Sequence, residues 1–341
     1  MISHAKNINV FFNKWLKINL VLVFLIIIVG GLTRLTDSGL SITEWELFSG
    51  ILPPLTNASW DNYFNLYKQI PQYKLLNYNM SLNEFKIIFY WEYAHRILAR
   101  LIGLFFLIPL FYFYLSSSIN KKKIKICFYV LFLILFQGVI GWYMVKSGLV
   151  NDVTVSHFRL SLHLIFAFLI ISTIFWLILN NKTEDIKTFF NFKNKKIFFL
   201  TLILLIFIQV SMGAFVSGLD AGKIYQTWPL MGETFFPNDI KINNLNIFFD
   251  LNNHSLVQFY HRVFAYIILA YVLIFSLYLY YQKEKKVYLS LTIILLVLSF
   301  QIFLGVCTLI SGLNIYLASA HQISSVLLVF SSIYLYYSYI K

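Results

Sequence analysis

The chain has 341 residues, of which 59% are hydrophobic and only 12% are charged, and its mean hydropathy is +0.73. This composition excludes a soluble globular protein and is typical of a polytopic membrane protein. The net charge of +13 would by itself suggest a nucleic-acid partner, but the lysines lie in segments between long apolar runs, which argues against nucleic acid.

Eight apolar runs are long enough to cross a bilayer as α-helices, because a spanning helix needs about 20 residues. We place them at residues 13–33, 94–116, 124–146, 157–179, 196–217, 255–281, 287–310 and 315–338. The expected fold is therefore an all-α polytopic membrane protein with eight transmembrane helices. The segment SLNE, Ser81 to Glu84, has the pattern of a capping box, so the second helix should begin outside the membrane, well before His95.

Lysines gather on one side of the eight runs and most acidic residues on the other. The lysines on the first side are Lys6, Lys14, Lys17, Lys121, Lys122, Lys123, Lys125, Lys182, Lys187, Lys193, Lys195, Lys196, Lys283, Lys285, Lys286 and Lys341. The acidic residues include Asp37, Glu44, Glu46, Asp61, Glu84, Asp220, Glu233, Asp239 and Asp250. Positive charge stays in the cytoplasm, so we expect both termini there.

The chain repeats itself. After the first run it reads GGLTRLTDSGLSITEWELFSGILPP, and after the fifth it reads GAFVSGLDAGKIYQTWPLMGETFFP. The shared residues, offset by 183 positions, are Asp37, Gly39, Trp45 and Pro54 in the first copy and Asp220, Gly222, Trp228 and Pro237 in the second. We therefore expect two tandem four-helix bundles, residues 1–180 and 181–341, related by a pseudo-two-fold axis along the membrane normal. The repeated loop should form a defined turn on the outer face, either as a structural lid or as part of a substrate entry.

Four histidines form two repeat-related pairs near the outer ends of their helices. The pairs are His95 with His163 and His261 with His321. Because the two helices of each pair run in the same direction, two imidazoles can face each other at one depth in each bundle. His157 and His254 have no equivalents in the other half, and we expect them to be solvated or interfacial.

Two facing imidazoles in an apolar bundle suit a haem iron. Zinc and copper sites usually add further His, Cys, Met or carboxylate ligands. Nearby glycines would allow close approach of a macrocycle or of a neighbouring helix; these are Gly138, Gly141, Gly148, Gly305 and Gly312. Arg96 and Arg262 directly follow a histidine, and either pairing with haem propionates or snorkelling to the interface would explain them.

The two halves differ in one acidic side chain. Glu92 lies one helical turn before His95, whereas Gln258 lies before His261. A titratable group near one metal indicates proton-coupled chemistry there, and a neutral amide suits plain electron transfer. The alternative is that Glu92 only forms an ion pair with Arg96 or with a lysine of an outer loop.

These features together resemble the haem A synthase family, of the proteobacterial and mitochondrial type. The resemblance rests on the E-x-x-H-R of Glu92 to Arg96, the His-Arg at His261, the A-H-Q of Ala320 to Gln322 and the duplicated layout, and it covers essentially the whole chain. Some bacterial members carry a cysteine pair in an outer loop. Here Cys127 and Cys307 both lie inside expected spans, where we expect small buried side chains.

The resemblance implies an oxidoreductase of a bacterial inner membrane that converts the C8 methyl of haem O into the formyl group of haem A by successive hydroxylations. It implies a resident haem b on His261 and His321 and a substrate haem on His95 and His163, with Glu92 as the essential acid. Arg96 is expected to contact the substrate haem.

Other functions remain open from the residues alone. The main alternative is a diheme b-type electron-transfer cytochrome, with or without a quinol, and a haem transporter or chaperone is a third. The expected partners are haem O, a haem O synthase, a membrane electron acceptor and the lipid bilayer. The sequence leaves the oligomeric state open, a homo-oligomer included.

Overall fold

The computed structural model describes residues 2–45, 49–117, 119–150, 152–181, 186–192, 195–241 and 245–341. Three charged residues used for the topology, Glu46, Lys182 and Lys193, lie outside them. The α-helices of the described part are α1 (Ile2–Leu35), α2 (Asn57–Tyr67), α3 (Pro71–Leu75), α4 (Leu82–Ser116), α5 (Lys121–Gly148), α6 (His157–Leu179), α7 (Lys196–Gly218), α8 (His254–Tyr281), α9 (Tyr288–Ile310) and α10 (Ile315–Ile340).

Within the described residues, eight helices are long and apolar enough to cross a membrane, as the sequence predicted. They are α1, α4, α5, α6, α7, α8, α9 and α10. The predicted early start of α4 is also confirmed, because Ser81 caps the helix. The Glu84 N–H donates to Ser81 Oγ at 3.3 Å, and the Ser81 N–H donates to Glu84 Oε2 at 2.8 Å. The chain is therefore a multi-pass membrane protein with one helix that extends well beyond its apolar run.

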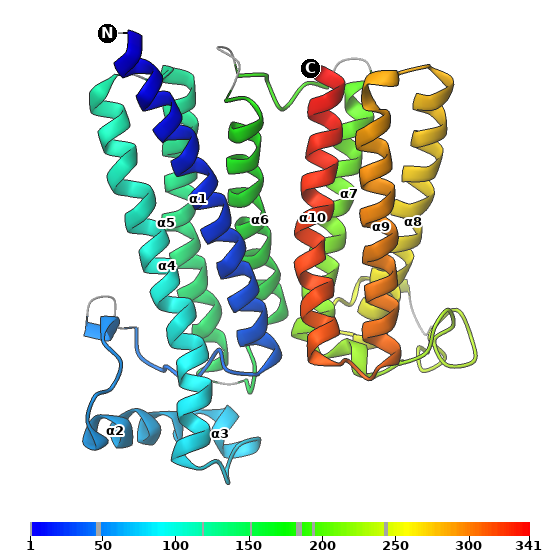
Figure 1. Cartoon of the computed structure of the whole chain (residues 1–341). Coiled ribbons are helices and arrows are strands. Elements are labelled where there is room, and N and C mark those ends of the chain that lie inside the picture. The colour runs from blue at the N-terminus through cyan, green and yellow to red at the C-terminus, as the bar shows by residue number, and fades with distance from the viewer. Residues whose placement is uncertain are drawn as a thin grey trace. The chain divides into compact units, whose positions relative to one another are not determined.

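The chain divides into two compact units, residues 1–178 and 179–341. In the first unit α1, α4, α5 and α6 run alongside one another, and α2 and α3 lie beyond one end of these helices (Figure 1). In the second unit α7, α8, α9 and α10 form the bundle (Figure 1). The relation between the bundles by a pseudo-two-fold axis stays a prediction.

Aromatic side chains fill the bundles at the helix ends far from the histidines. In the first unit the ring of Trp15 packs 4.7 Å from Phe106 and 5.3 Å from Phe113, measured between ring centres. In the second unit Phe199 lies 4.8 Å from Phe275 and 4.5 Å from Tyr339. Helix association in lipid depends on close van der Waals packing, so these clusters hold the helices together at the cytoplasmic side of the expected topology.

The outer end of the first unit has its own apolar core. It joins the loop after α1, the short helix α2 and the outer turns of α4. The buried members are Leu40, Ile42, Trp60, Phe64, Tyr67, Ile70, Phe85 and Phe89. This cluster explains why α4 begins so far before its apolar run, because its first turns supply the surface on which α2 packs.

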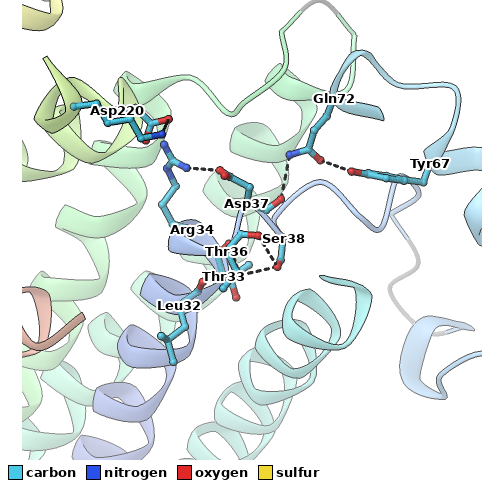
Figure 2. A network of polar contacts seen from close by, with 10 residues as sticks. Leu32, Thr33, Arg34, Thr36, Asp37, Ser38, Tyr67, Gln72 and Asp220 are labelled. Atoms are coloured by element: carbon cyan, nitrogen blue, oxygen red, sulfur yellow. Dashed lines mark hydrogen bonds and ion pairs between the residues drawn. The ribbon is translucent and has the colours of Figure 1, made fainter. Parts of the chain in front are cut away.

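The repeated Asp-x-Gly segment forms the same turn in both units, as expected. Asp37 and Asp220 have left-handed φ angles of 50° and 52°, and each is the second residue after the end of its helix. Asp37 accepts from Arg34 at 2.7 Å, and its peptide oxygen accepts from Gln72 Nε2 at 3.1 Å (Figure 2). Tyr67 in turn donates to Gln72 Oε1 at 3.0 Å. The turn is thus tied to the outer core of the first unit.

Candidate functional site

The structure brings together the imidazole pairs that the sequence predicted. His95 on α4 and His163 on α6 have ring centres 6.4 Å apart, with ring planes inclined at 61°. His261 on α8 and His321 on α10 have ring centres 6.5 Å apart, with planes at 89°. Each pair lies inside one unit, and all four rings are partly buried.

The spacing within each pair fits a single metal ion between the two rings. Two metal–nitrogen bonds of about 2 Å, together with roughly 1 Å from each ring nitrogen to its ring centre, give about 6 Å between the centres. Among the described residues, no group of three or more His, Cys, Asp and Glu side chains is placed to hold a metal ion. Each site thus offers two imidazoles, the ligand set of a haem iron with two axial histidines.

Each imidazole lies against a glycine of a neighbouring helix. A methyl group on Gly141 would lie 3.2 Å from His163, and one on Gly305 would lie 2.9 Å from His321. Two further glycines do the same and were missed from the sequence: they are Gly30, at 3.1 Å from His95, and Gly213, at 3.2 Å from His261. Gly30 and Gly213 are 183 positions apart, so the repeat offset was the signal that could have found them.

The other glycines singled out in the sequence do not touch a histidine. A methyl group on Gly138 would meet nothing within 4 Å. One on Gly148 would lie 2.7 Å from Leu40, and Gly312 has a φ of 70° at the end of α9. Gly148 and Gly312 therefore serve helix packing and a turn, which is the ordinary structural explanation.

Glutamines hold the peptide units of three of the histidines. The Nε2 atoms donate to the peptide oxygens of His163 (from Gln137, 2.9 Å), His261 (from Gln209, 2.9 Å) and His321 (from Gln301, 3.0 Å). Ser324 contributes a further bond to the His321 peptide oxygen at 3.0 Å and another to Gln301 Oε1. Such contacts fix the backbone that carries a ligand, as outer-shell contacts of metal ligands do.

Glu92 is buried, with 3% of its surface exposed, and both of its carboxylate oxygens accept hydrogen bonds. Oε2 accepts from Ser41 Oγ at 2.7 Å and from the Ile42 N–H at 2.9 Å. Oε1 accepts from Arg96 at 2.7 and 3.1 Å. The ion pair with Arg96 that the sequence left open is therefore present, and the carboxylate also anchors the outer loop.

The two arginines that follow His95 and His261 hold equivalent loops. Arg96 donates to the peptide oxygens of Ile42 at 2.8 Å and Glu44 at 3.1 Å. Arg262 donates to Tyr225 and Thr227 at 2.9 and 2.8 Å, and these two residues lie 183 positions after the first pair. Gln258, in the place of Glu92, also donates to the Tyr225 peptide oxygen, at 2.7 Å. Both outer loops are thus fastened to the helix that carries the first histidine of each pair.

The remaining histidines and the cysteines lie apart from the pairs. His254 is exposed at the start of α8, as expected. The solvated alternative is wrong for His157, which is only 8% exposed and has its ring centre 4.1 Å from that of Phe158, whereas its interfacial position stays a prediction. Cys127 and Cys307 are free thiols, buried and half-buried.

Comparison of the sequence with known proteins identifies the family of the chain. The model of the COX15-CtaA family, described as cytochrome oxidase assembly protein, matches residues 13–333. The chain is 48% identical over 333 residues to a protein named heme A synthase of Pelagibacter ubique, covering 97% of each chain. Proteins of the same name from Rickettsia bellii and Rickettsia felis are 43% and 39% identical, each covering 95% of this chain and 96% of their own. The chain belongs to the COX15-CtaA family of cytochrome oxidase assembly proteins.

Proposed function

We propose that this protein is a haem A synthase, an oxidoreductase that converts the C8 methyl group of haem O into the formyl group of haem A. The observation that carries the proposal is the presence of two imidazole pairs, each spaced for one iron, in a chain whose full-length relatives bear that name. One pair would serve a resident cofactor and the other the substrate. The proposed location is the bacterial inner membrane, with both termini in the cytoplasm.

The second unit would hold the resident haem b. His261 and His321 would hold it through their imidazoles, and the neutral Gln258 leaves no acidic group near His261 on α8. When bound, this haem supplies reversible one-electron transfer. The residues of the second unit then have the task of holding two imidazoles in fixed positions. The glycine contacts and the Gln209 and Gln301 hydrogen bonds suit that task.

The first unit would bind the substrate haem through His95 and His163. Conversion of the methyl group into a formyl group adds one oxygen from water and releases four electrons and four protons, which pass to a membrane acceptor and to solvent. The successive hydroxylations would give a gem-diol on the substrate that loses water. The protein must therefore hold the substrate in one orientation and manage charge and protons at its outer end.

Glu92 is the residue proposed to manage that charge. Its carboxylate is held by Ser41, the Ile42 N–H and Arg96, so it is a charged group in a fixed place one helical turn from His95. It would stabilise positive charge that develops on the substrate or accept a proton as water adds. Arg96 would contribute its positive charge to binding of the substrate haem while it keeps the outer loop closed.

The test is haem analysis of membranes from a host that makes haem O but no haem A. Expression of the chain should produce haem A, which acid extraction and chromatography separate from haem O. Unchanged haem O in a protein that retains two low-spin haems would support the diheme cytochrome instead. Transfer of unchanged haem O to an acceptor protein would support a haem carrier.

A further inference from the structure

Three of the four histidines share one device on the neighbouring helix. The glutamine that binds the histidine peptide oxygen lies four residues before the glycine that contacts the same imidazole. The pairs are Gln137 with Gly141 on α5, Gln209 with Gly213 on α7 and Gln301 with Gly305 on α9. Residues four apart lie on one helix face, so each pair supports both the backbone and the ring of one histidine.

Two of the three glutamine residues also contact the ring, Gln301 through its peptide oxygen and Gln209 through its side-chain amide. His321 Nδ1 lies 3.1 Å from the peptide oxygen of Gln301, and His261 Nδ1 lies 3.2 Å from Gln209 Nε2. His163 Nδ1 and Gln137 Oε1 are both buried without a hydrogen-bond partner in the described part of the chain. The two residues are joined only through the bond from Gln137 Nε2 to the His163 peptide oxygen, so at this site the glutamine holds the backbone and not the ring. At His321 the Nδ1–H can donate to the Gln301 peptide oxygen, which leaves Nε2 as the nitrogen that can bind iron. The Gln209 amide nitrogen can only donate, so its contact with His261 Nδ1 does not favour the same tautomer.

His95 lacks this device. Gly30 contacts its ring, but the residue four positions earlier on α1 is Ile26, which stands 183 positions before Gln209. Within the described ranges, no side chain donates a hydrogen bond to the peptide oxygen or to the ring of His95. The ring also differs in orientation, because Nε2 faces its glycine, whereas Cε1 is the nearest atom in the other three histidines.

We propose that three glutamines, Gln137, Gln209 and Gln301, are positioning residues that hold their histidines in fixed positions. His95 has Ile26 in place of such a glutamine, and we infer that its imidazole is the one that can leave the iron and return. This rests on the proposed function for the identity of the group that the histidines hold. The resident haem would then have two locked ligands and stay bound. The substrate haem would have one locked ligand, His163, and would enter and leave through release of His95.

Carbon monoxide tests the proposal, because it binds a ferrous haem only where an axial imidazole leaves. In the reduced full-length protein loaded with haem O, carbon monoxide should bind at the substrate site and spare the resident haem. Ile26→Gln should slow that binding about five- to tenfold, the factor that one added hydrogen bond is worth. Ile26→Leu is the matched control and should bind carbon monoxide at the wild-type rate.

The second unit provides the converse measurement. Gln209→Met and Gln301→Met keep the shape of the side chain and remove the amide donor. Each should open the resident haem to carbon monoxide and shift its low-spin electron paramagnetic resonance signal, while haem content remains at the wild-type level. A merely structural role would lower haem content and leave the spectrum of the bound haem unchanged.

Two results would overturn the proposal. One is a resident haem that binds carbon monoxide as fast as the substrate haem in the wild-type protein. The other is resistance of the resident haem to carbon monoxide in both glutamine variants. Both results are read from carbon monoxide binding and do not depend on catalysis. Failure to form haem A would therefore contradict the proposed function, while the difference between the two haem sites could still be measured.

Discussion

Glu92 combines two features in one side chain, because its carboxylate anchors the outer loop and places a negative charge on α4 one helical turn from His95. Its three partners come from α4 itself and from the loop at Ser41 and Ile42. In the other unit Gln258 keeps the loop contact to Tyr225 without the charge. The anchoring task is therefore shared by both halves, and the charge belongs to one.

Glu92→Gln separates the two features. The amide can still accept from Ser41 and Ile42, so the loop should stay closed, while the charge is lost. We expect haem A formation to fall about 100-fold or more, the range for loss of one acid–base group. The haem A to haem O ratio in extracts measures it, with Glu84→Gln, at the exposed start of α4, as control. Haem A formation at the wild-type rate would exclude the charge role.

Gly213 predicts a steric effect on one site. A methyl group there would lie 3.2 Å from His261, which forces the ring or the helix to move by a few tenths of an ångström. Gly213→Ala should therefore lower the content of low-spin haem in the second unit. Gly138→Ala, where the methyl group meets nothing within 4 Å, should leave haem content unchanged. Equal spectra for the two variants would show that the glycine contact is unimportant.

At the scale of the elements, the outer core makes α4 a rigid link between the loop and the site. Phe85 is fully buried there, 5.0 Å from the ring of Phe64 and 5.2 Å from that of Tyr67. Phe85→Ala should cost about 3–5 kcal/mol of local stability. Thermal unfolding in detergent and protease cleavage between α1 and α4 would measure it. Tyr78→Ala, at an exposed ring, should change neither.

The loop between α7 and α8 depends on a carboxylate. Burial tends to raise the pKa of Asp239, but hydrogen bonds from Tyr225 and Ser255 and from its own backbone outweigh it, so the pKa lies below the usual value. A lowered pKa means stabilisation that is present above the pKa of the unfolded chain and lost as pH falls through the folded value.

Protease resistance of this loop should therefore persist down to the usual aspartate range and fall only at lower pH. Asp239→Asn should be more sensitive at neutral pH and show no such transition. Loss of resistance well above the usual aspartate range in the wild-type protein would contradict the assignment.

The helices were predictable from the sequence because lipid imposes one length and one polarity on each of them. The imidazole pairs were predictable because the repeat marked them. The residues that pack against the histidines could not be predicted, because Gly30 and Gln209 resemble ordinary residues of apolar helices until the facing histidine is known. The arginines hold each loop through a peptide oxygen, that of Ile42 or of Tyr225. Every residue carries a peptide oxygen, so the side chains of the loop do not predict this contact.

At the scale of the whole molecule, duplication supplies two similar sites, and a few residues distinguish them. The second unit keeps glutamines behind both histidines and an uncharged residue at Gln258. The first unit has Ile26 behind one histidine and a buried acid at Glu92. A locked, uncharged site suits a permanent electron carrier, and an exchangeable, charged site suits a substrate that must be oxidised and released.

Substitution of one histidine in each unit tests this division. His321→Ala should remove the low-spin signal of the resident haem and abolish haem A formation, because electrons then have no path from the substrate. His163→Ala should abolish haem A formation but keep the resident signal, since it leaves His261 and His321 at their 6.5 Å spacing. His254→Ala, outside both pairs, should retain both properties. If His163→Ala erased the resident signal and His321→Ala preserved it, the roles of the two units would be reversed.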